Sequence, residues 1–302
     1  MAIPYNRDMV ATPLPEPRTI DVDGISTRYY EAGSGDPLVL VYGGNFGTSD
    51  SGSSAYTWSQ NWRALAQRHR VIMPDKLGQG HTDNPKNDDY TMRAVVQHLA
   101  GFLGAMDLPP VHIVGHSRGG YAAARVTLEH HDRVRSLSLV NSGTLSPGVG
   151  TNEVVLARSP FPKYTAECVR WVYQNYSYNP DVVTDEWVNS VLEVLAQPKY
   201  RESVRKVEGE KLGVRLFLPE LAREKRETLQ WLAEGRLQRP TQIVWGFDDR
   251  TATLDRGLEL FRILAQHERR TQLHVINQSG HFPFREHPQR FNALLSRFTA
   301  TC

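Results

Sequence analysis

Short apolar runs alternate with stretches of helical periodicity through the first half of the chain and again near its end. Runs such as Pro37–Tyr42 and Val134–Val140 are apolar at nearly every position, as is typical of strands buried on both faces. In 90–106, by contrast, the apolar residues recur on one face of a helix. Strands that alternate with helices predict a mostly parallel central sheet flanked by helices. Strands are expected at 19–22, 26–32, 37–42, 70–75, 111–114, 134–140, 241–245 and 271–276, and helices at 58–69, 90–106, from 121 onward, 163–174, 184–196, 200–207, 218–234, 254–266 and 286–298.

The pattern changes after the sixth of these strands. From 144 to 239 the sequence shows charged amphipathic helices and no convincing strand. The economical interpretation is one α/β core domain, 1–143 and 240–302, with a helical cap inserted at 144–239. An insertion at this point would lie above the carboxyl ends of the strands, where open α/β sheets bind ligands, so we expect it to act as a lid. The first two strands, joined by a turn at Asp23-Gly24, predict an antiparallel hairpin at the sheet edge.

Composition narrows the classes of function. The 302 residues carry a formal net charge of +2, which argues against nucleic acid or an acidic membrane as the main partner. No apolar run reaches the length of a membrane span, and the first residues lack the apolar segment of a signal peptide. The two cysteines, Cys168 and Cys302, provide neither a disulfide framework nor metal-ligand spacing, which favours a cytoplasmic protein without a metal. We expect a small-molecule substrate and no cofactor, and a homo-oligomer stays open.

The pattern G-x-S-x-G follows the strand that begins at Val111. Gly115 and Gly119 flank Ser117 by two residues on each side, and a helix rich in small residues begins after them. A serine on so sharp a strand-to-helix turn has strained backbone angles and needs small neighbours, and the turn lifts its hydroxyl above the sheet edge. The sequence therefore predicts that Ser117 is a catalytic nucleophile.

Serine is a poor nucleophile unless a base accepts its proton and an acid orients that base. Asp249 follows the strand at 241–245, and His281 follows the strand at 271–276. The order Ser, Asp, His, each on a loop after its own strand, is the order of an α/β-hydrolase triad. We expect His281 to be the base and Asp249 the acid, while the adjacent Asp248 caps its own turn. Asn141, after the sixth strand, offers no alternative carboxylate.

Acyl transfer also requires donors for the developing oxyanion. The backbone N–H of Arg118, directly after the nucleophile, is one expected donor. The turn after Val41 supplies the other, from Gly44 or alternatively from Asn45, because glycines there let the backbone approach a ligand. Residues near these positions are the expected substrate-binding side chains: Tyr42, Asn45, Phe46, His116 and Phe282.

These motifs together resemble the α/β-hydrolase superfamily over nearly the whole chain from about Thr19. The stretches that carry the resemblance are Gly115–Gly120, Trp245-Gly246, Gly280-His281 and Glu286-His287-Pro288. The arrangement is most similar to capped hydrolases that cleave C–C bonds in meta-cleavage products of aromatic compounds. The resemblance implies an α/β-hydrolase fold and a serine hydrolase active in aromatic compound degradation. The aspartate-nucleophile branches, haloalkane dehalogenases and epoxide hydrolases, do not fit a serine at 117.

The chain departs from that subfamily at several positions. His116 replaces the asparagine before the serine, and Phe282 replaces the tryptophan after the histidine. Val191 stands in the place of the lid arginine that binds the dienoate carboxylate, and Tyr42 replaces the histidine before the oxyanion glycine. The triad chemistry carries over, and the bond cleaved stays open between an ester or lactone and the C–C bond of a dienoate.

Two other functions compete with hydrolysis. A cofactor-free lyase or oxygenase on the same fold would depend on His281 but little on Ser117. A ligand receptor with vestigial hydrolysis would bind tightly and react poorly with a phosphonate probe. Fold alone does not decide among them, so the discriminating observation is the dependence of turnover on Ser117. A cation opposite the oxyanion hole would separate the two hydrolytic options, because it would hold the carboxylate of a dienoate.

Overall fold

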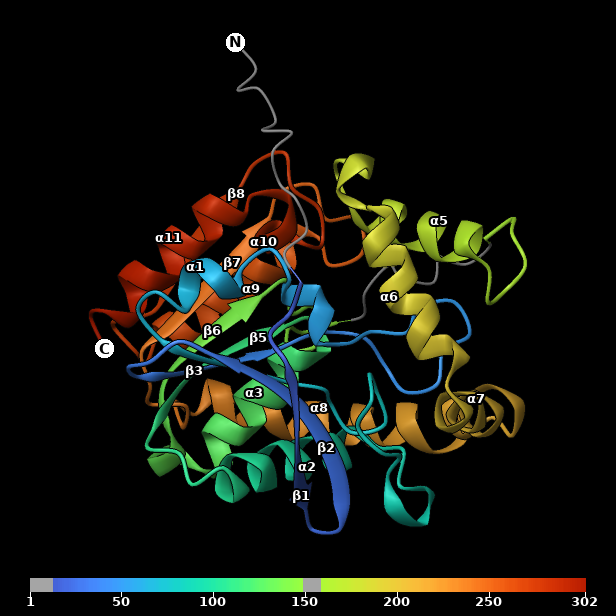
Figure 1. Ribbon diagram of the computed structural model, residues 1–302. Helices are drawn as coiled ribbons and strands as arrows, with labels where there is room; N and C mark the ends of the chain where they lie inside the picture. The colour runs from blue at the N-terminus through green and yellow to red at the C-terminus, as the bar shows by residue number, and fades with distance from the viewer. Residues whose placement is uncertain (1–12, 149–158) are drawn as a thin grey trace.

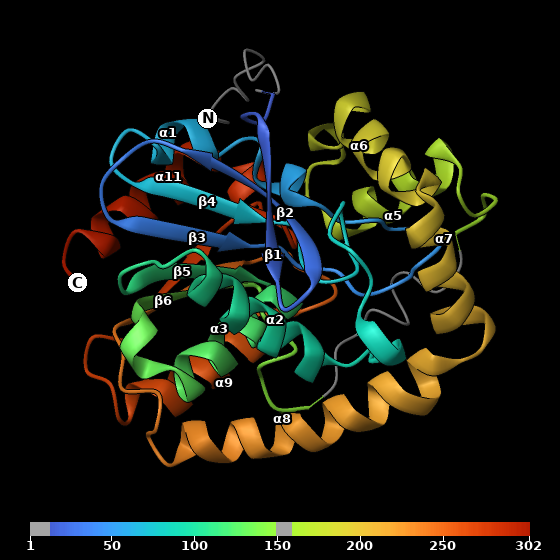
Figure 2. The same ribbon diagram turned by 60° about the horizontal axis from the view of Figure 1, so that its bottom comes forward.

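A computed structural model describes residues 13–148 and 159–302, and its centre is one eight-stranded sheet. The strand order is β1-β2-β4-β3-β5-β6-β7-β8 (Figures 1 and 2). The predicted hairpin is confirmed, because β1 and β2 pair antiparallel, and β2 is also antiparallel to β4. All other neighbours are parallel. The strands are β1 Pro17–Val22, β2 Ile25–Ala32, β3 Pro37–Val41, β4 Arg70–Pro74, β5 Val111–His116, β6 Val134–Val140, β7 Thr241–Gly246 and β8 Gln272–Ile276.

Helices cover both faces of the sheet, as the apolar strands require. On one face, buried residues of α2, Met92–Ala105, α3, Arg118–Glu129, and α9, Leu254–Ala265, pack on the sheet. On the other face lie α1, Trp62–Leu65, and α11, Pro288–Thr299 (Figure 1). Side chains alternate between these two apolar layers along each strand. This burial confirms the predicted fold class, a mostly parallel sheet flanked by helices.

Two predicted helices are shorter in the structure. The helix expected at 58–69 is reduced to a 3₁₀ turn, Ala55–Trp58, and the short α1. Between them the buried side chain of Asn61 donates to the Phe284 carbonyl oxygen, a tertiary contact that local periodicity does not reveal. The closing helix begins at Pro288 and not at 286, because the residue before a proline is disfavoured in helical conformation. A separate turn, α10, Pro283–Glu286, precedes it.

Every regular element that the structure describes between β6 and β7 is a helix, and turns and irregular segments connect these helices. Helices α5, α6 and α7 stand together beside the carboxyl ends of the strands, whereas α8 runs back along α2 and α9 (Figure 2). The buried residues of α5 and α6 belong to one apolar cluster and those of α8 to the other. The cap boundaries at 144 and 239 stay a prediction. The elements are α5 Ala166–Tyr176, α6 Asp185–Ala196, α7 Pro198–Val204, α8 Leu218–Ala233, the 3₁₀ turns at Lys86–Asp88, His131–Arg133 and Pro180–Val182, and the π turns at Arg205–Gly209 and Gly213–Phe217.

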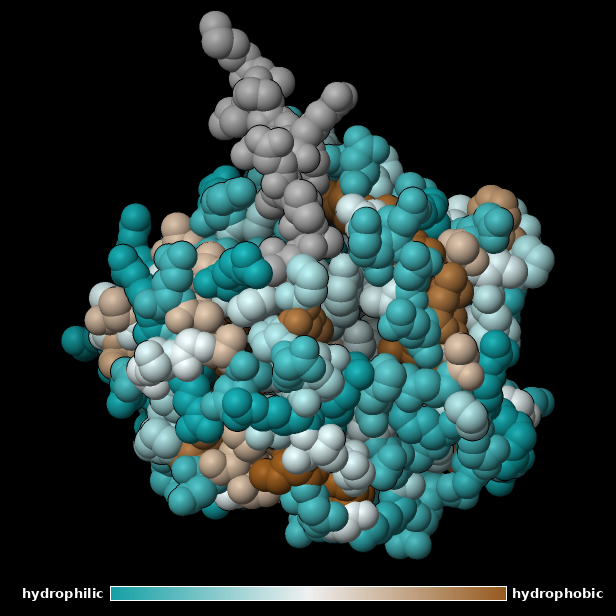
Figure 3. Space-filling model, in the orientation of Figure 1, coloured by the Kyte–Doolittle hydropathy of each residue, from teal (hydrophilic) through white to brown (hydrophobic). Residues whose placement is uncertain are grey.

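Among the described residues, the exposed large apolar side chains are Phe161, Tyr178, Val214, Leu218, Phe247 and Leu258. The face shown in Figure 3 is mainly hydrophilic, and its hydrophobic residues form small separate groups. Within residues 13–148 and 159–302, no helix is both long and apolar enough to span a membrane.

Candidate active site

Ser117 lies on the predicted sharp turn between β5 and α3. Its φ of 52° and ψ of −125° are rare for a residue with a side chain, and its N–H donates to the Val140 carbonyl oxygen at 2.8 Å. A Cβ at Gly115 would lie 2.4 Å from the Gly120 Cα, and one at Gly119 would lie 2.4 Å from the Tyr42 carbonyl oxygen. Both glycines are therefore required by close packing around the strained serine.

His281 and Asp249 form a buried hydrogen-bonded pair. The imidazole Nδ1–H donates to Asp249 Oδ2 at 2.6 Å, which leaves Nε2 as the free ring nitrogen. The side chain of Asp249 is fully buried and that of His281 is 6% exposed. Each residue follows its own strand, β7 or β8, and therefore reaches the same edge of the sheet as Ser117. Ser117 and His281 line one cavity.

Further donors surround the Asp249 carboxylate. Oδ1 accepts from the backbone N–H and the hydroxyl of Thr251, each at 2.8 Å, and from the N–H of Ala252 at 3.0 Å. Burial alone would raise the pKa of Asp249, but His281 and the surrounding donors outweigh it and hold the pKa below its usual value. The carboxylate is thus charged and fixed in one orientation.

Asn141 is part of this arrangement, although the sequence marked it only as a non-acid. Its Nδ2 donates to Asp249 Oδ2 at 2.6 Å, and its Oδ1 accepts from the Gly246 N–H at 3.1 Å. The sequence signal that could have identified Asn141 was its position directly after β6, at the sheet edge where Ser117, Asp249 and His281 also lie. The adjacent Asp248 has a different partner. Its Oδ2 accepts from the Ser279 N–H at 3.3 Å, which ties the two loops together.

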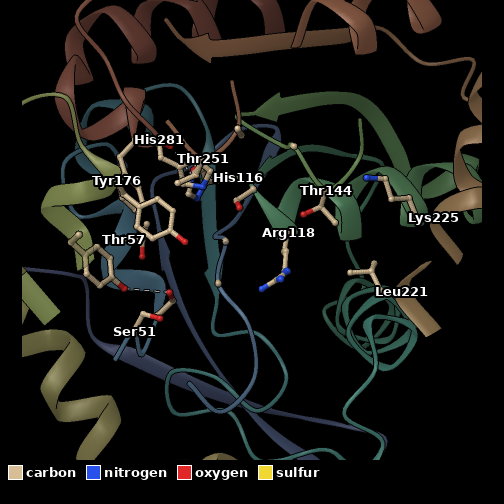
Figure 4. Close-up of a pocket in the computed structure, with 18 of the residues that line it drawn as sticks. Ser51, Thr57, His116, Arg118, Thr144, Tyr176, Leu221, Lys225, Thr251 and His281 are labelled. Atoms are coloured by element: carbon tan, nitrogen blue, oxygen red, sulfur yellow. Dashed lines mark hydrogen bonds between the residues drawn. The ribbon is translucent and has the colours of Figure 1, made fainter. Parts of the chain in front are cut away.

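The cavity beside Ser117 has a volume of about 500 Å³. Figure 4 shows Tyr176, Thr57 and Ser51 on one side, Leu221 and Lys225 on the other, and Arg118 extending into the space between them. Tyr173 and Phe282 also line the cavity, and the Phe282 ring packs against those of Tyr173 and Tyr176. One half of the cavity is therefore aromatic, and the other half combines aliphatic residues of α8 with cationic groups.

The two expected oxyanion donors both line this cavity. Gly44 has a φ of +82°, and its carbonyl oxygen accepts from the Lys76 Nζ at 3.2 Å. Among the described residues, neither the Gly44 N–H nor the Arg118 N–H donates to another group. These N–H groups are thus available to a ligand at the cavity floor, and their use for an oxyanion stays a prediction.

The expected substrate-binding residues separate into two groups. His116 and Phe282 line the cavity, whereas Tyr42, Asn45 and Phe46 lie outside its lining, and a substrate-binding role stays a prediction for all five. Tyr42 continues the side-chain alternation of β3 into the apolar layer under α1 and α11, where its hydroxyl accepts from the Lys76 N–H. Phe46 packs edge-on against Tyr90 in the opposite layer, and Asn45 is half-buried outside the cavity lining.

His116 is hydrogen-bonded to the loop that carries His281. Its Nε2–H donates to the His281 carbonyl oxygen at 2.9 Å. Burial, with the nearby His281, lowers the pKa of His116 well below its usual value, so the ring stays neutral. Sequence reasoning missed Tyr176, whose carbonyl oxygen accepts from the His281 N–H at 2.8 Å and whose ring stacks on the imidazole. No local pattern in α5 distinguished it from other aromatic residues.

Glu286 connects the loop before His281 to the segment after α5. Its carboxylate accepts from the backbone N–H groups of Gly280, Tyr178 and Asn179, at 2.7, 2.8 and 2.9 Å. Burial raises the pKa of Glu286 to about 7 despite these donors. The loop that carries the imidazole is thereby fixed to the segment that follows α5.

The residues at this site suit acyl chemistry. Across 13–148 and 159–302, no group of three or more His, Cys, Asp or Glu side chains is placed to hold a metal ion. A strained serine, a His–Asp pair and free N–H donors at one cavity can together provide a nucleophile, a base and oxyanion stabilisation.

Comparison with known proteins agrees with this geometry. Residues 36–288 match the family model described as alpha/beta hydrolase fold. The chain is 30% identical to a 2-hydroxymuconate semialdehyde hydrolase from Pseudomonas sp. (strain CF600), over 94% of this chain and 93% of that one. It is 29% identical to a 2-hydroxy-6-oxo-2,4-heptadienoate hydrolase from Pseudomonas putida, over 94% and 96%.

Solved structures give the same result. A meta-cleavage product hydrolase from Pseudomonas fluorescens IP01 superposes with a TM-score of 0.76 at 28% identity, covering 94% of this chain and 97% of that one. A serine hydrolase involved in carbazole degradation gives a TM-score of 0.75 at 25% identity, covering 95% and 99%. The family match over most of the chain and these full-length similarities lead to one conclusion: the chain is a hydrolase and belongs to the alpha/beta hydrolase fold family.

Proposed function

We propose that this protein is a serine hydrolase that cleaves the C–C bond beside the keto group of a 2-hydroxy-6-oxo-dienoate. The supporting observation is the buried 2.6 Å Asp249–His281 pair at the cavity that Ser117 lines. The names of the full-length relatives, hydrolases of 2-hydroxymuconate semialdehyde and of 2-hydroxy-6-oxo-2,4-heptadienoate, indicate the substrate class.

The proposed reaction begins with a tautomerisation. A proton moves from the 2-hydroxyl group to the carbon next to the reacting carbonyl, so that the C–C bond to be cleaved joins a saturated carbon to that carbonyl. His281 Nε2, the free ring nitrogen, then accepts the Ser117 proton as the hydroxyl attacks the carbonyl carbon. Asp249 holds the imidazole in the required tautomer and stabilises its positive charge.

The tetrahedral oxyanion would lie between the N–H groups of Gly44 and Arg118. When it collapses, the electrons of the C–C bond pass into the conjugated leaving group as an enolate, which takes the proton from His281. The acyl group stays on Ser117, and water releases it as a carboxylic acid with His281 again as the base. The products are a hydroxydienoate and a carboxylate. The reaction is a hydrolysis that consumes one water and needs no oxidant or reductant.

The cap and the cellular location belong to this proposal. Residues 144–239 would cover the site as a lid, and the Tyr173 and Tyr176 side chains of α5 would contact the acyl end of the substrate. A cytoplasmic location is supported by the unpaired state of Cys168 and Cys302. The second candidate is hydrolysis of an ester or lactone, since the aromatic half of the cavity would accept a neutral substrate equally well.

Turnover by Ser117→Ala tests the proposal. We expect the wild-type protein to cleave 2-hydroxy-6-oxo-2,4-heptadienoate faster than a panel of neutral esters and lactones. The Ser117→Ala variant should lose a factor on the order of 10⁴ or more in kcat, because loss of the nucleophile removes most of the triad's contribution. The measurement is the decay of the dienoate absorbance, with the melting temperature as a control for folding.

Other outcomes select the competing functions. Fast turnover of esters alone would favour the ester or lactone alternative. Turnover that depends on His281 but not on Ser117 would favour the lyase or oxygenase. Tight binding without turnover would favour a receptor.

A further inference from the structure

Arg118 places its guanidinium group in the cavity without a hydrogen-bond or ion-pair partner among the described residues. The side chain extends from the start of α3 into the open space beside Ser117 (Figure 4). Its recorded contact is a cation–π interaction with Phe217, at 5.3 Å from the ring centroid. Among residues 13–148 and 159–302 it has neither a hydrogen bond nor an ion pair. A guanidinium group has five N–H donors, and in this partly buried side chain none of them has an acceptor among the described residues.

The described surroundings of Arg118 hold a phenol and a lysine and no carboxylate in the cavity lining. Burial lowers the pKa of Arg118, and the group that acts in the opposite direction is the phenol of Tyr176, not a carboxylate. Burial also lowers the pKa of Lys76 well below its usual value, and the charge of Arg118 adds to that effect. The described residues that line the cavity include no aspartate or glutamate. The charge of Arg118 is therefore not neutralised by the part of the chain that the structure describes.

A second cation of the cavity differs in this respect. Lys225, on α8, donates from its Nζ to the Gly148 carbonyl oxygen at 2.7 Å. Arg118 has no such acceptor in the described part of the chain, and it directly follows the proposed nucleophile in sequence. A planar guanidinium matches a carboxylate with two parallel hydrogen bonds, whereas a neutral ester offers it a weaker acceptor.

We infer that Arg118 binds the carboxylate of the substrate. In this orientation the carboxylate end of the substrate extends toward α8, and its acyl end extends toward the aromatic half of the cavity. This inference rests on the proposed function and adds the orientation of the substrate. On α6, Val191, at the place where the family resemblance puts a carboxylate-binding arginine, is a buried apolar residue that does not line the cavity. The cationic and aromatic halves on either side of Ser117 support the same orientation.

Replacement of the guanidinium tests the inference with a charged and a neutral substrate. Arg118→Met should lower kcat/KM for 2-hydroxy-6-oxo-2,4-heptadienoate by a factor on the order of 10², the loss expected for a charged hydrogen-bonded contact. The kcat/KM for the methyl ester of the same compound should change less than about threefold, since the ester lacks the negative charge. Arg118→Lys should retain part of the activity on the acid. Equal losses on acid and ester, or no loss on either, would overturn the inference.

Calorimetric binding separates this inference from the proposed function. Sorbate and its neutral amide, sorbamide, carry a conjugated chain but no keto group, so their binding requires no C–C bond cleavage. Wild-type protein should bind sorbate more tightly than sorbamide, and Arg118→Met should remove that preference. If the preference exists while the dienoate is not cleaved, the proposed function fails and the carboxylate site stands. If wild-type protein shows no preference, the carboxylate site is wrong.

Arg223→Met is the matched control. Arg223 lies on α8 outside the cavity, pairs with Glu220, and is 69% exposed. Removing this surface arginine changes the net charge by the same amount as Arg118→Met. The control should leave the preference for sorbate unchanged, and a similar loss in both variants would assign the effect to long-range charge.

Discussion

Asp249 and Arg118 are both charged, but they differ in how many of their hydrogen bonds the protein provides. Asp249 accepts from His281, Asn141 and the Thr251–Ala252 turn, so both carboxylate oxygens are occupied. Arg118, at the same cavity, has no hydrogen-bond acceptor among the described residues. A charge whose hydrogen bonds are complete is held in place and can orient another group. A charge left incomplete is available to bind a ligand.

The two charged groups also belong to differently connected parts of the site. Asn141 bridges Asp249 and the Gly246 N–H, and Glu286 fixes the loop of His281 to the segment after α5. Such satisfied networks hold a unique geometry. The side of the cavity formed by α8 offers aliphatic contacts, and Arg118 of α3 extends beside it without a hydrogen-bond acceptor among the described residues.

Asp249→Asn, which removes the charge of the fully hydrogen-bonded carboxylate, should cause the largest loss of activity. An asparagine cannot both accept from His281 Nδ1–H and stabilise the imidazolium as an anion does, so we expect kcat to fall by about 10⁴. Steady-state kinetics on the dienoate measures it. Asp248→Asn is the control, because this adjacent carboxylate contacts Ser279 and not the imidazole, and its activity should stay within a few-fold of wild type. Similar losses in both variants would contradict the assignment of Asp249.

Glu286→Gln should have a smaller effect, and it depends on pH. The folded protein holds the Glu286 proton up to about pH 7, while the unfolded chain releases it near 4.5. The raised pKa means that the stabilisation is present below pH 4.5 and is lost as the pH rises to 7. Relative to Glu286→Gln, the free energy of unfolding of the wild type should fall by at most about 3 kcal/mol across this window. Urea unfolding at several pH values measures the difference, and parallel pH curves would contradict it.

Much of the fold could be predicted because the signals are local. The strands are continuous apolar runs, and the loops that carry Ser117, Asp249 and His281 each follow one of them. The sharp turn at Ser117 was visible in the glycines beside it. Parallel strands bring their carboxyl ends together, so the predicted residues meet at one sheet edge without knowledge of their distances.

The rest of the site depends on tertiary contacts that no local pattern encodes. Asn141 and Tyr176 contact the His–Asp pair through partners distant in sequence. Phe46 was expected in the pocket because it lies near the oxyanion turn, but it packs against Tyr90 of the core. Proximity in sequence to a catalytic loop does not determine which side of the loop a side chain occupies. The lack of a described acceptor for Arg118 likewise depends on tertiary placement and not on a local pattern.

Covalent labelling of Ser117 tests the central claim most directly. A fluorophosphonate reacts with a serine only when a base and an oxyanion site activate it. We predict that one equivalent attaches to wild-type protein, that mass spectrometry places it on the peptide containing Ser117, and that labelling is lost in Ser117→Ala and strongly slowed in His281→Ala. Labelling at another residue, or equal rates with and without the His281 imidazole, would contradict the account.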